Sequence, residues 1–351
     1  MAGFPGETIS DELRAVAREY DLGGIILFGR NVEAPEQVSE LAHDVQAMSH
    51  ELPLWVSIDQ EGGRVARLRE PFTVWPPMCT LGRSGEVELA KRFSRALARE
   101  LRAVGVSLDY APVLDVHSNA ESPVIGDRAL SDAADDVARL GSAIIRGLQD
   151  EGVAACGKHF PGHGDTSADS HHELPVVEHP PERIREVELV PFQAAVASDV
   201  AMIMTAHVLY PALDEECPAT LSRAIVTDIL RHELGFAGLI ATDDLSMQAI
   251  TAHGSVEDAC VSAVAAGCDL LLLCAPDVEQ QVRAVEALIR AVESAAIPVT
   301  RIDDAMARQH RVKARFLAGT LTRRPLPPKE LRALLSCDEH TAVADEMRQF
   351  A

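Results

Sequence analysis

Basic residues and long apolar runs are both scarce in this sequence. Lys and Arg number 32 against 54 Asp and Glu, which gives a formal net charge of -22. Such a chain repels polyanions, so we expect neither a nucleic acid nor an anionic membrane as a partner. The apolar runs, such as residues 269–274, are far shorter than the roughly 20 residues that a membrane-spanning helix needs.

Targeting signals, cysteine pairs and nucleotide-binding motifs are missing as well. Residues 1–7 show no basic segment followed by an apolar stretch and a cleavage site, so we predict a cytoplasmic protein. The seven cysteines form no CxxC pair and no zinc-finger spacing, which predicts reduced and mostly buried thiols. No GxGxxG or GxxxxGKS/T follows a strand-like run, which argues against a nucleotide-binding fold.

The sequence does contain the composition of a globular chain and a regular alternation of short and long segments. Hydrophobic residues make up 47% and charged residues 25% of the chain, as in packed domains. Short apolar runs alternate with segments of helical period such as residues 86–104, where leucine or phenylalanine recurs every fourth residue. We interpret seven runs as strands: residues 24–28, 54–58, 106–110, 153–157, 201–205, 238–241 and 269–273. Between them we expect helices at residues 35–50, with Pro35 in the first turn, and at 86–104, 133–148, 181–197, 222–234, 256–266 and 278–292.

Strands that alternate with helices predict an α/β fold, and this number of units favours a (β/α)8 TIM barrel, whose usual length is about 250 residues. The count is one strand short. A shortened first strand would lie at Met1 to Phe4, directly before a helix that Thr8 or Ser10 could cap. A doubly wound parallel sheet shows the same alternation and is the alternative fold.

One large domain and a short tail are expected. Three prolines in residues 320–328 interrupt the pattern after the last long helical segment, residues 302–317. Residues 329–351 predict one short helical tail, which is too short to bury a core of its own. We therefore assign residues 1–319 to the barrel domain and residues 320–351 to the tail, and we expect a monomer.

Polar residues gather where the predicted strands end. The second strand runs into residues 59–67, the fourth into residues 158–165, the fifth into His207, and the sixth into Asp243 and Asp244. In a barrel of this kind the functional side chains lie on the loops after the strands. Turns that only reverse the chain use Gly, Asn or Ser, so this concentration of charge indicates an active site.

The loop after the fourth predicted strand holds the densest cluster, with four of the 13 histidines. Two interpretations are open from these residues alone. His159, His163 and Asp165 could bind a metal ion such as zinc. Alternatively, Asp169 precedes His171 by two residues, so both side chains of an extended loop point the same way. The carboxylate would then fix one ring nitrogen and leave the other to exchange protons near neutral pH.

Five motifs follow one another along the chain: DQEGGRV at residues 59–65, IGDR at 125–128, KHFPGHGD at 158–165 with DSH at 169–171, MTAH at 204–207, and TDDLSM at 242–247. Together they closely resemble the signature of glycoside hydrolase family 3 β-N-acetylhexosaminidases. The resemblance covers nearly the whole chain from Gly3 to about Leu317, and five motifs in order are far more specific than one.

The resemblance implies a single-domain retaining β-N-acetylglucosaminidase that removes terminal GlcNAc from GlcNAc-anhydromuropeptides during peptidoglycan recycling. It implies that Asp243 is the nucleophile, that Asp169 and His171 form the acid/base dyad, and that no metal or cofactor takes part. It also implies a set of sugar-binding residues, namely Asp59, Arg67, Arg128, Lys158, His159 and His207.

Three other functions are compatible with these residues. A β-glucosidase or a broader hexosaminidase could use the same scaffold, although the KHFPGHG string with DSH favours the N-acetyl class. A metal-dependent barrel hydrolase would use His159, His163 and Asp165. A carbohydrate-binding protein that has lost catalysis would bind sugar without turnover, but this sequence keeps both Asp243 and the Asp169–His171 pair.

Overall fold

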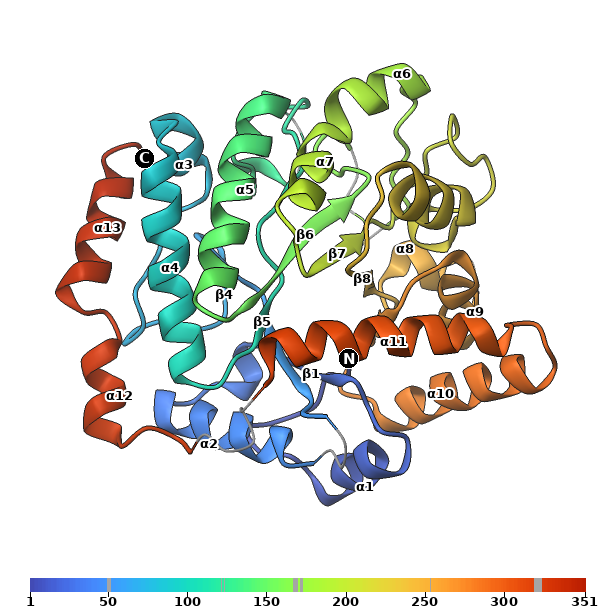
Figure 1. Ribbon diagram of the computed structural model, residues 1–351, viewed down its shortest axis with the longest axis horizontal. Helices are drawn as coiled ribbons and strands as arrows, with labels where there is room; N and C mark the ends of the chain where they lie inside the picture. Colours follow the sequence, from blue (N-terminus) through green and yellow to red (C-terminus); the bar gives the residue numbers. More distant parts are fainter. Residues whose placement is uncertain are drawn as a thin grey trace.

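The computed structural model describes the chain except residues 49–51, 121, 123, 167–169, 171–172, 253 and 319–323. Its centre is a curled, seven-stranded parallel sheet surrounded by helices (Figure 1). The strands lie in the sheet in chain order. They are β1 (Gly24–Leu27), β2 (Trp55–Ile58), β5 (Leu108–Asp109), β6 (Ala154–Phe160), β7 (Met202–Thr205), β8 (Leu239–Asp244) and β9 (Leu270–Leu272).

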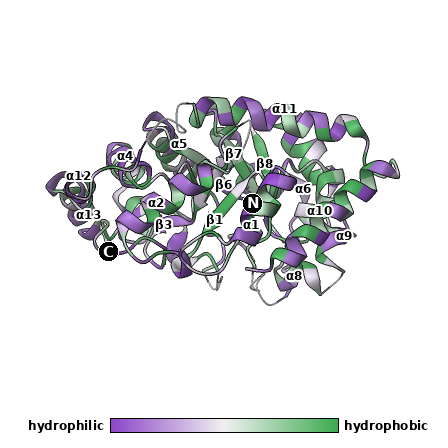
Figure 2. Cartoon of the chain, turned by 90° about the horizontal axis from the view of Figure 1, so that it is seen from below, coloured by the Kyte–Doolittle hydropathy of each residue, from purple (hydrophilic) through white to green (hydrophobic). Residues whose placement is uncertain are grey.

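All seven predicted strands are confirmed, with ends that differ by a few residues. Their side chains are buried on both faces, which explains why the strands are continuous apolar runs rather than alternating ones. One face packs against the helices, and the other forms an inner cluster that includes Trp55, Met202 and Leu239. Figure 2 shows this pattern, with green along the strands and purple on the outer sides of the helices.

The two edges of the sheet are joined by the first residues of the chain. Ala2 forms parallel bridges to Ile25, in β1, and to Leu273, next to β9. The Ala2 N–H donates to the Gly24 carbonyl at 3.0 Å, and the Gly3 N–H donates to the Leu273 carbonyl at 2.8 Å. The strand predicted at Met1 to Phe4 is therefore present only as these bridges. The strand order never reverses, so the doubly wound alternative is wrong.

The helices cover the outside of the sheet at the predicted places. Ser10 caps α1 by accepting the Leu13 N–H at 3.1 Å, and Pro35 begins α2, because its fixed φ and missing N–H suit a first turn. The main helices are α1 (Asp11–Glu19), α2 (Pro35–Gln46), α3 (Cys79–Ser84), α4 (Val87–Ala103), α5 (Ala134–Asp150), α9 (Val256–Ala266), α10 (Val278–Glu293) and α11 (Val299–Phe316).

Two predicted helices are irregular. Residues 181–197 divide into α6 (Pro181–Arg183), the π-helical η3 (Ile184–Glu188) and α7 (Val190–Ala197). Pro191 lies in the first turn of α7, where its missing N–H costs no intrahelical hydrogen bond, so the helix restarts there. The helix predicted at residues 222–234 is π-helical over η5 (Ala224–Glu233).

The C-terminal tail is helical, and it is divided into two helices, α12 (Pro328–Leu334) and α13 (Asp338–Arg348). Ser336, between them, has a positive φ of 49°, which breaks the helical path. Both helices lie beside α4 in Figure 1, and Leu331 and Met347 are buried in the main core. The boundary predicted between residues 319 and 320 lies outside the described residues.

A buried carboxylate holds the tail against α4. Glu100 accepts hydrogen bonds from the Thr73 hydroxyl at 2.6 Å and the Ser336 N–H at 2.7 Å, and His340 Nδ1 lies 2.9 Å from it. Burial raises the pKa of Glu100, but the hydrogen bonds from His340, Thr73 and Ser336 outweigh burial and lower the pKa below its ordinary value. The ionised carboxylate therefore connects residues 240 positions apart in the sequence.

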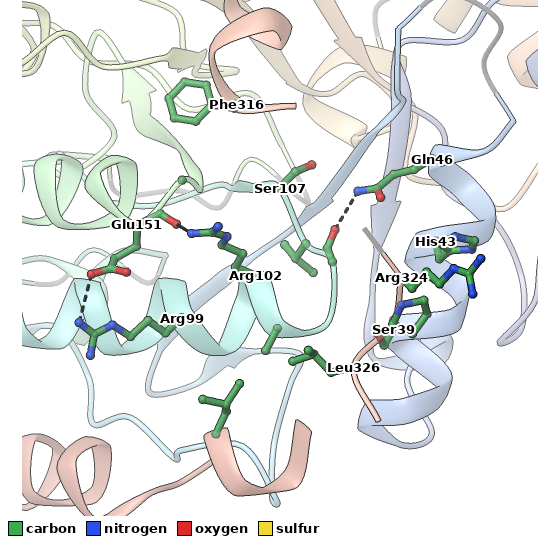
Figure 3. A pocket seen from close by; sticks show the side chains of 16 residues that line it. Ser39, His43, Gln46, Arg99, Arg102, Ser107, Glu151, Phe316, Arg324 and Leu326 are labelled. Carbon is green, nitrogen blue, oxygen red and sulfur yellow. Dashed lines mark hydrogen bonds and ion pairs between the residues drawn. The ribbon is translucent and has the colours of Figure 1, made fainter. Parts of the chain in front are cut away.

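The tail also borders a cavity of about 530 Å³ between α2 and α4 (Figure 3). Residues 105–107, which line this cavity, precede β5, so it lies at the amino ends of the strands. Active sites of barrel enzymes lie at the opposite, carboxyl ends. This cavity is therefore not where the chemistry is expected.

Two further predictions concern the burial of the cysteines and the presence of membrane-spanning helices. All seven cysteines are unpaired; Cys156, Cys260 and Cys268 are buried and the other four are half-buried, so the thiols are less buried than predicted. Among the described residues, no helix has the length and apolarity to cross a membrane.

We expect Glu100→Gln to lower the free energy of unfolding by about 2 kcal/mol at neutral pH, because hydrogen bonds to a buried charge are replaced by weaker ones. The pKa of Glu100 is lower in the folded chain, so its stabilisation is present above the ordinary pKa and is lost as the pH falls through the folded value. Urea unfolding at several pH values should show that the difference in the free energy of unfolding between this variant and the wild type becomes smaller below about pH 4.5.

Glu88→Gln is the matched control on the same helix. Glu88 is exposed and lies 3.6 Å from Lys91, an arrangement that contributes little to stability. An equally large loss in this control, or a loss in Glu100→Gln that does not depend on pH, would contradict the role given to Glu100.

Candidate active site

A cavity of about 640 Å³ opens at the carboxyl ends of the strands. Its floor comes from the inner face of the sheet, and its walls come from the loops after β1, β2, β5, β6, β8 and β9. The polar side chains that line it are Arg30, Asp59, Glu61, Arg64, Arg67, Tyr110, Arg128, Lys158, His159, His163, Ser170, Asp243, Asp244, Ser246 and Cys274. Most of the sequence-predicted site residues are therefore brought together here.

The loop after β2 forms a small antiparallel hairpin, β3 (Gln60–Gly62) and β4 (Val65–Ala66). Gly62 has a φ of 112°, and a Cβ there would lie 2.9 Å from the Pro76 carbonyl oxygen, so only glycine fits this turn. The Gln60 N–H donates to Asp109 at 2.9 Å, and the Gln60 side chain accepts the Arg67 N–H at 2.8 Å. These bonds hold both ends of the hairpin.

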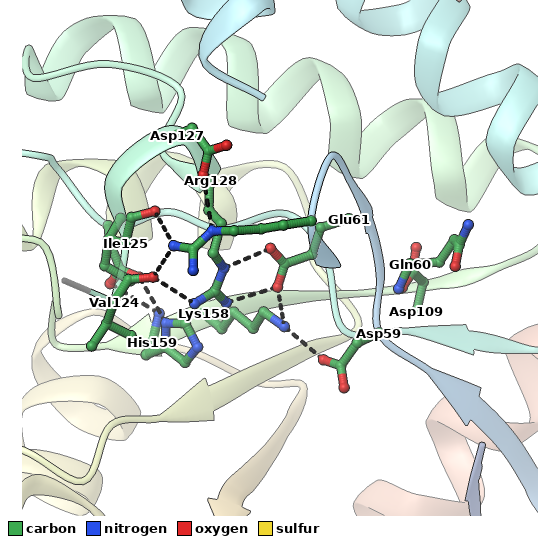
Figure 4. A network of polar contacts seen from close by, with 12 residues as sticks. Asp59, Gln60, Glu61, Asp109, Val124, Ile125, Asp127, Arg128, Lys158 and His159 are labelled. Carbon is green, nitrogen blue, oxygen red and sulfur yellow. Dashed lines mark hydrogen bonds and ion pairs between the residues drawn. The ribbon is translucent and has the colours of Figure 1, made fainter. Parts of the chain in front are cut away.

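Glu61 is the centre of an ionic network that joins the hairpin after β2, the segment after β5 and strand β6 (Figure 4). Its carboxylate accepts two hydrogen bonds from Arg128, at 2.8 and 2.9 Å, and lies 2.7 Å from Lys158 Nζ. Lys158 Nζ also donates to Asp59 at 2.8 Å. Burial raises the pKa of Glu61, but Arg128 and Lys158 outweigh burial and hold the pKa well below its ordinary value. The same contacts raise the pKa of Lys158 and of Arg128 despite burial.

Glu61 was missed as a functional residue by sequence reasoning, although it lies inside the DQEGGRV motif. The signal that could have found it is its position two residues after Asp59 in an unusually charged strand end. Arg64, in the same motif, binds Asp127 at 3.0 Å and the Val124 carbonyl at 2.6 Å, and so helps to position the loop that carries Arg128.

His159 is oriented by Asp115, a second residue that sequence reasoning missed. His159 Nδ1 lies 2.7 Å from one Asp115 oxygen, and the His159 N–H donates to the other at 3.1 Å. Burial raises the pKa of Asp115, but His159 and His163 outweigh burial and lower it. Because Nδ1 is occupied, Nε2 is the ring nitrogen left to contact a ligand.

The two ring nitrogens of His163 contact side chains of its own loop, so neither is left for a ligand in the cavity. Its Nδ1 lies 2.7 Å from the Thr166 hydroxyl, and its Nε2 lies 3.1 Å from the Ser170 hydroxyl. Burial, with the neighbouring His159, lowers the pKa of His163 to about 4, so the ring is neutral at pH 7. His163 therefore holds together the residues on either side of 167–169.

The metal-binding interpretation does not fit the geometry. Asp165 lies 2.6 Å from His179 and accepts the Ser118 hydroxyl at 2.9 Å, while both ring nitrogens of His163 are occupied and His159 is bound to Asp115. In the described part of the chain, no three His, Cys, Asp or Glu side chains form a group that could hold a metal ion.

Asp243 is the second-to-last residue of β8, lies at the cavity wall and is half-buried. Its Oδ1 accepts the Asp244 N–H at 2.8 Å. Burial raises the pKa of Asp243, but His207, His159 and Lys158 help to outweigh burial and lower the pKa below its ordinary value. The carboxylate is therefore ionised at neutral pH and available as a nucleophile.

Asp244 and His207 support this strand end. Asp244 accepts the N–H groups of Ser246 and Cys274, each at 3.0 Å, and burial raises its pKa. His207 Nδ1 lies 2.8 Å from the Thr220 hydroxyl, and its Nε2 lies 2.9 Å from the Asp244 carbonyl oxygen. His207, expected to bind sugar, is buried with both ring nitrogens occupied and is not among the cavity-lining residues.

Asp169 and His171, the predicted acid/base dyad, lie outside the described residues. Ser170, between them in the sequence, is described and lines the cavity. Its carbonyl oxygen accepts the Ala249 N–H at 3.3 Å, next to the loop after β8. The geometry of the dyad therefore stays a prediction.

The order of the strands places Asp59 and Asp243 on opposite walls. When Ala2 is counted as the bridge between the edges, β5, β6 and β7 separate β2 from β8 on one side. On the other side, β1, the Ala2 segment and β9 separate them, again three positions. A ligand that contacts Asp243 at one end can thus meet Asp59, Lys158 and Arg67 at the other.

Comparison with known proteins agrees with this arrangement. The family profile described as "Glycosyl hydrolase family 3 N terminal domain" matches residues 3–312. The beta-hexosaminidase of Nitrosomonas eutropha is 42% identical over 280 residues, which cover 78% of this chain and 80% of that protein. The beta-hexosaminidase of Pseudomonas aeruginosa strain LESB58 is 42% identical over 275 residues, which cover 78% and 81%.

Two solved structures are similar over the whole chain. A glycoside hydrolase family 3 beta-N-acetylglucosaminidase from Paenibacillus sp. FPU-7 is 43% identical with a TM-score of 0.95, and this chain spans 66% of its length. NagZ from Neisseria gonorrhoeae, in complex with N-trifluoroacetyl-D-glucosamine, is 31% identical with a TM-score of 0.82, and 97% of its length is covered. The chain therefore belongs to glycosyl hydrolase family 3 and is a glycoside hydrolase of the β-hexosaminidase type.

Proposed function

We propose that this protein is a retaining β-N-acetylglucosaminidase that hydrolyses terminal β-linked GlcNAc through a covalent glycosyl-aspartate intermediate. The observation that carries the proposal is the ionised Asp243 on one wall of the cavity, opposite the network of Asp59, Lys158, Glu61 and Arg128. The bound N-trifluoroacetyl-D-glucosamine of the Neisseria structure supports a pocket for an N-acyl sugar in this family.

In the first step, an Asp243 oxygen attacks the anomeric carbon while the bond from that carbon to the leaving oxygen breaks. The leaving oxygen takes a proton from the His171 imidazolium, whose orientation Asp169 would fix. The sugar is then an ester of Asp243, and the aglycone has left as a neutral alcohol. A histidine with an ordinary pKa near 6.5 can serve as this acid at neutral pH.

In the second step, the neutral His171 takes a proton from water as the water oxygen attacks the anomeric carbon. The bond to Asp243 breaks, so the carboxylate and the imidazolium are both regenerated. Each step inverts the anomeric carbon, and two inversions retain the β configuration.

The polar network fixes the sugar while charge develops at the anomeric carbon. Lys158 and Arg128 are N–H donors held in place by Glu61, and Asp59 is an acceptor held by Lys158. Such groups need little reorganisation when the ligand arrives, which is how an enzyme stabilises a transition state. Arg67 and His159 complete the proposed sugar-binding set, and His207 contributes by supporting β8.

We further propose the natural setting. The substrate is a GlcNAc-anhydromuropeptide, the reaction belongs to peptidoglycan recycling, and the protein acts as a cytoplasmic monomer. The catalytic domain, residues 1–319, is a (β/α)8 barrel whose first strand is the short Ala2 segment, and residues 320–351 are its tail.

The first test follows nitrophenol release from 4-nitrophenyl β-N-acetylglucosaminide in the presence of EDTA. We expect turnover by the wild type and a loss of at least about 10³-fold in Asp243→Ala, because the covalent step needs its nucleophile. No turnover by the wild type would favour a non-catalytic sugar-binding protein, and turnover that EDTA abolishes would favour a metal-dependent hydrolase.

Asp244→Asn is the control next to the nucleophile. The asparagine oxygen can still accept the N–H groups of Ser246 and Cys274, so we expect activity to fall by less than about tenfold. An equal loss in both variants would remove the nucleophile assignment from Asp243.

His171→Ala should lose kcat/KM unevenly between substrates. We expect a loss of at least about 10²-fold on chitobiose, whose leaving alcohol needs a proton, and a much smaller loss in nitrophenol release, which needs none. Because the pKa of Asp243 is lowered, that carboxylate is ionised across pH 5 to 8 and cannot cause a pH dependence there. The variant should therefore also flatten the kcat/KM profile of chitobiose hydrolysis, and equal losses on both substrates would contradict the acid role.

The alternative functions on the same scaffold differ in the sugar that they accept. Initial rates on the 4-nitrophenyl β-glycosides of GlcNAc, GalNAc and glucose separate them. We expect the GlcNAc substrate to be fastest. Equal rates on GlcNAc and GalNAc would indicate a broader hexosaminidase, and preference for glucose a β-glucosidase.

A further inference from the structure

The catalytic cavity has a neighbour with which it shares one side chain. A second hollow of about 420 Å³, here called the side pocket, lies between the loop after β1 and the segment after β4. It is lined by Gly29, Val32, Glu33, Ala34, Pro35, Ala66, Arg67, Arg69, Glu70, Pro71 and Phe72. Arg67 lines both spaces, so its side chain stands between them.

Phe28 and Arg30 line the catalytic cavity and lie with Arg67 at this wall, and the three side chains are here called the partition. The Arg30 guanidinium carbon lies 4.4 Å from the centre of the Phe28 ring, and that of Arg67 lies 5.5 Å from it. Both distances are within the range of attractive cation–π contacts. Both cations of the partition therefore contact the same aromatic ring.

Phe28 and Arg30 are firmly anchored. Arg30 donates to the Phe4 carbonyl at 3.0 Å and to the Cys274 carbonyl at 2.8 Å. The Phe28 N–H donates to the side chain of Asn31 at 2.9 Å, and Asn31 is buried and itself donates to the Phe4 carbonyl. The ring is thus fixed relative to β1 and the first residues of the chain.

Arg67 has weaker support of its own. Its side chain donates to Asp59 at 3.4 Å, a long bond, and its Nε has no hydrogen-bond partner among the described residues. The contact with Phe28 therefore supplements the long bond to Asp59 in holding the guanidinium in the partition. Phe28 acts through Arg67 and is a positioning residue.

The position of the partition bears on which sugar of a chain the cavity can accept. The Arg67 end of the partition lies beside Asp59, which follows β2 on the wall opposite Asp243, whereas its Arg30 end reaches the Cys274 carbonyl after β9. In a pyranose ring, C1 and C4 are at opposite ends, so a sugar with C1 at Asp243 directs O4 toward the partition. A second sugar attached to O4 would extend toward Arg67, the side chain that stands between the cavity and the side pocket.

We propose that Phe28, by holding Arg67 in the partition, restricts this enzyme to terminal sugars, and that the side pocket accepts a second sugar when the partition is removed. The proposal rests on the proposed function. The side pocket has a suitable chemistry, because exposed Arg69, Glu33 and Glu70 surround apolar side chains such as Phe72. A sugar ring likewise presents hydroxyls at its edge and C–H groups on its face.

The test is Phe28→Ala assayed with 4-nitrophenyl β-chitobioside, with early products separated by chromatography. The wild type should release GlcNAc and 4-nitrophenyl GlcNAc first, because only the terminal sugar fits. The variant should also release intact chitobiose with nitrophenol, and the share of intact chitobiose should rise at least about tenfold, as expected for loss of a cation–π wall.

Three further variants make the readout specific. Phe28→Tyr keeps the aromatic face and should restore the wild-type products. Phe28→Leu keeps apolar bulk without the ring, so it should show the same gain if Phe28→Ala fails to fold. Phe28→Ala combined with Ala66→Phe should cancel the gain, because Ala66 lines the side pocket and the added ring would fill it.

The outcomes separate this proposal from the one on which it rests. If the variants are folded by circular dichroism and hydrolyse 4-nitrophenyl GlcNAc, yet form no more intact chitobiose than the wild type, the partition proposal alone is overturned. If the wild type itself does not hydrolyse 4-nitrophenyl GlcNAc, the proposed function falls, and the partition proposal falls with it.

Discussion

The buried carboxylate of Glu61 is the contact that gathers the catalytic face of this protein. It joins the hairpin after β2 to Arg128, in the loop after β5, and to Lys158, near the end of β6. A buried charge is costly unless it is paired and hydrogen-bonded, and here two cations satisfy both oxygens. Since the hairpin, the segment after β5 and strand β6 meet at one ionised group, the donors and acceptors around the cavity have fixed positions before any ligand binds.

This arrangement also accounts for the state of the groups around Asp243. The chain carries a net charge of -22, and such a background disfavours another ionised carboxylate. Around Asp243 the local environment is different, because Lys158, His159 and His207 lie near this carboxylate and lower its pKa. Asp244, one residue later, is bound to backbone N–H groups and has a raised pKa. Two adjacent carboxyls thus have different properties because their surroundings differ.

Much of the fold could be predicted from local patterns, and the errors have local causes. The seven apolar runs became strands, and the helices began near Ser10 and Pro35 as capping chemistry requires. The helix predicted at residues 181–197 is broken because Pro191 forces a restart. The tail is helical as predicted, and it is divided into two helices because the chain turns at Ser336. The short strand at Ala2 has no pattern of its own, since its bonds are made to strands on both sides.

The sequence by itself determined the order of the strands and the polar residues that follow each one, because apolar period and turn chemistry depend on neighbouring residues. It also carried the motifs that identify the family. Only the tertiary structure decided which of these residues touch. Glu61 and Arg128 are 67 positions apart, and His159 and Asp115 are 44 apart, so their pairing exists only when the sheet curls and its edges meet at Ala2. For the same reason, the partition of Phe28, Arg30 and Arg67 has no signature in the sequence.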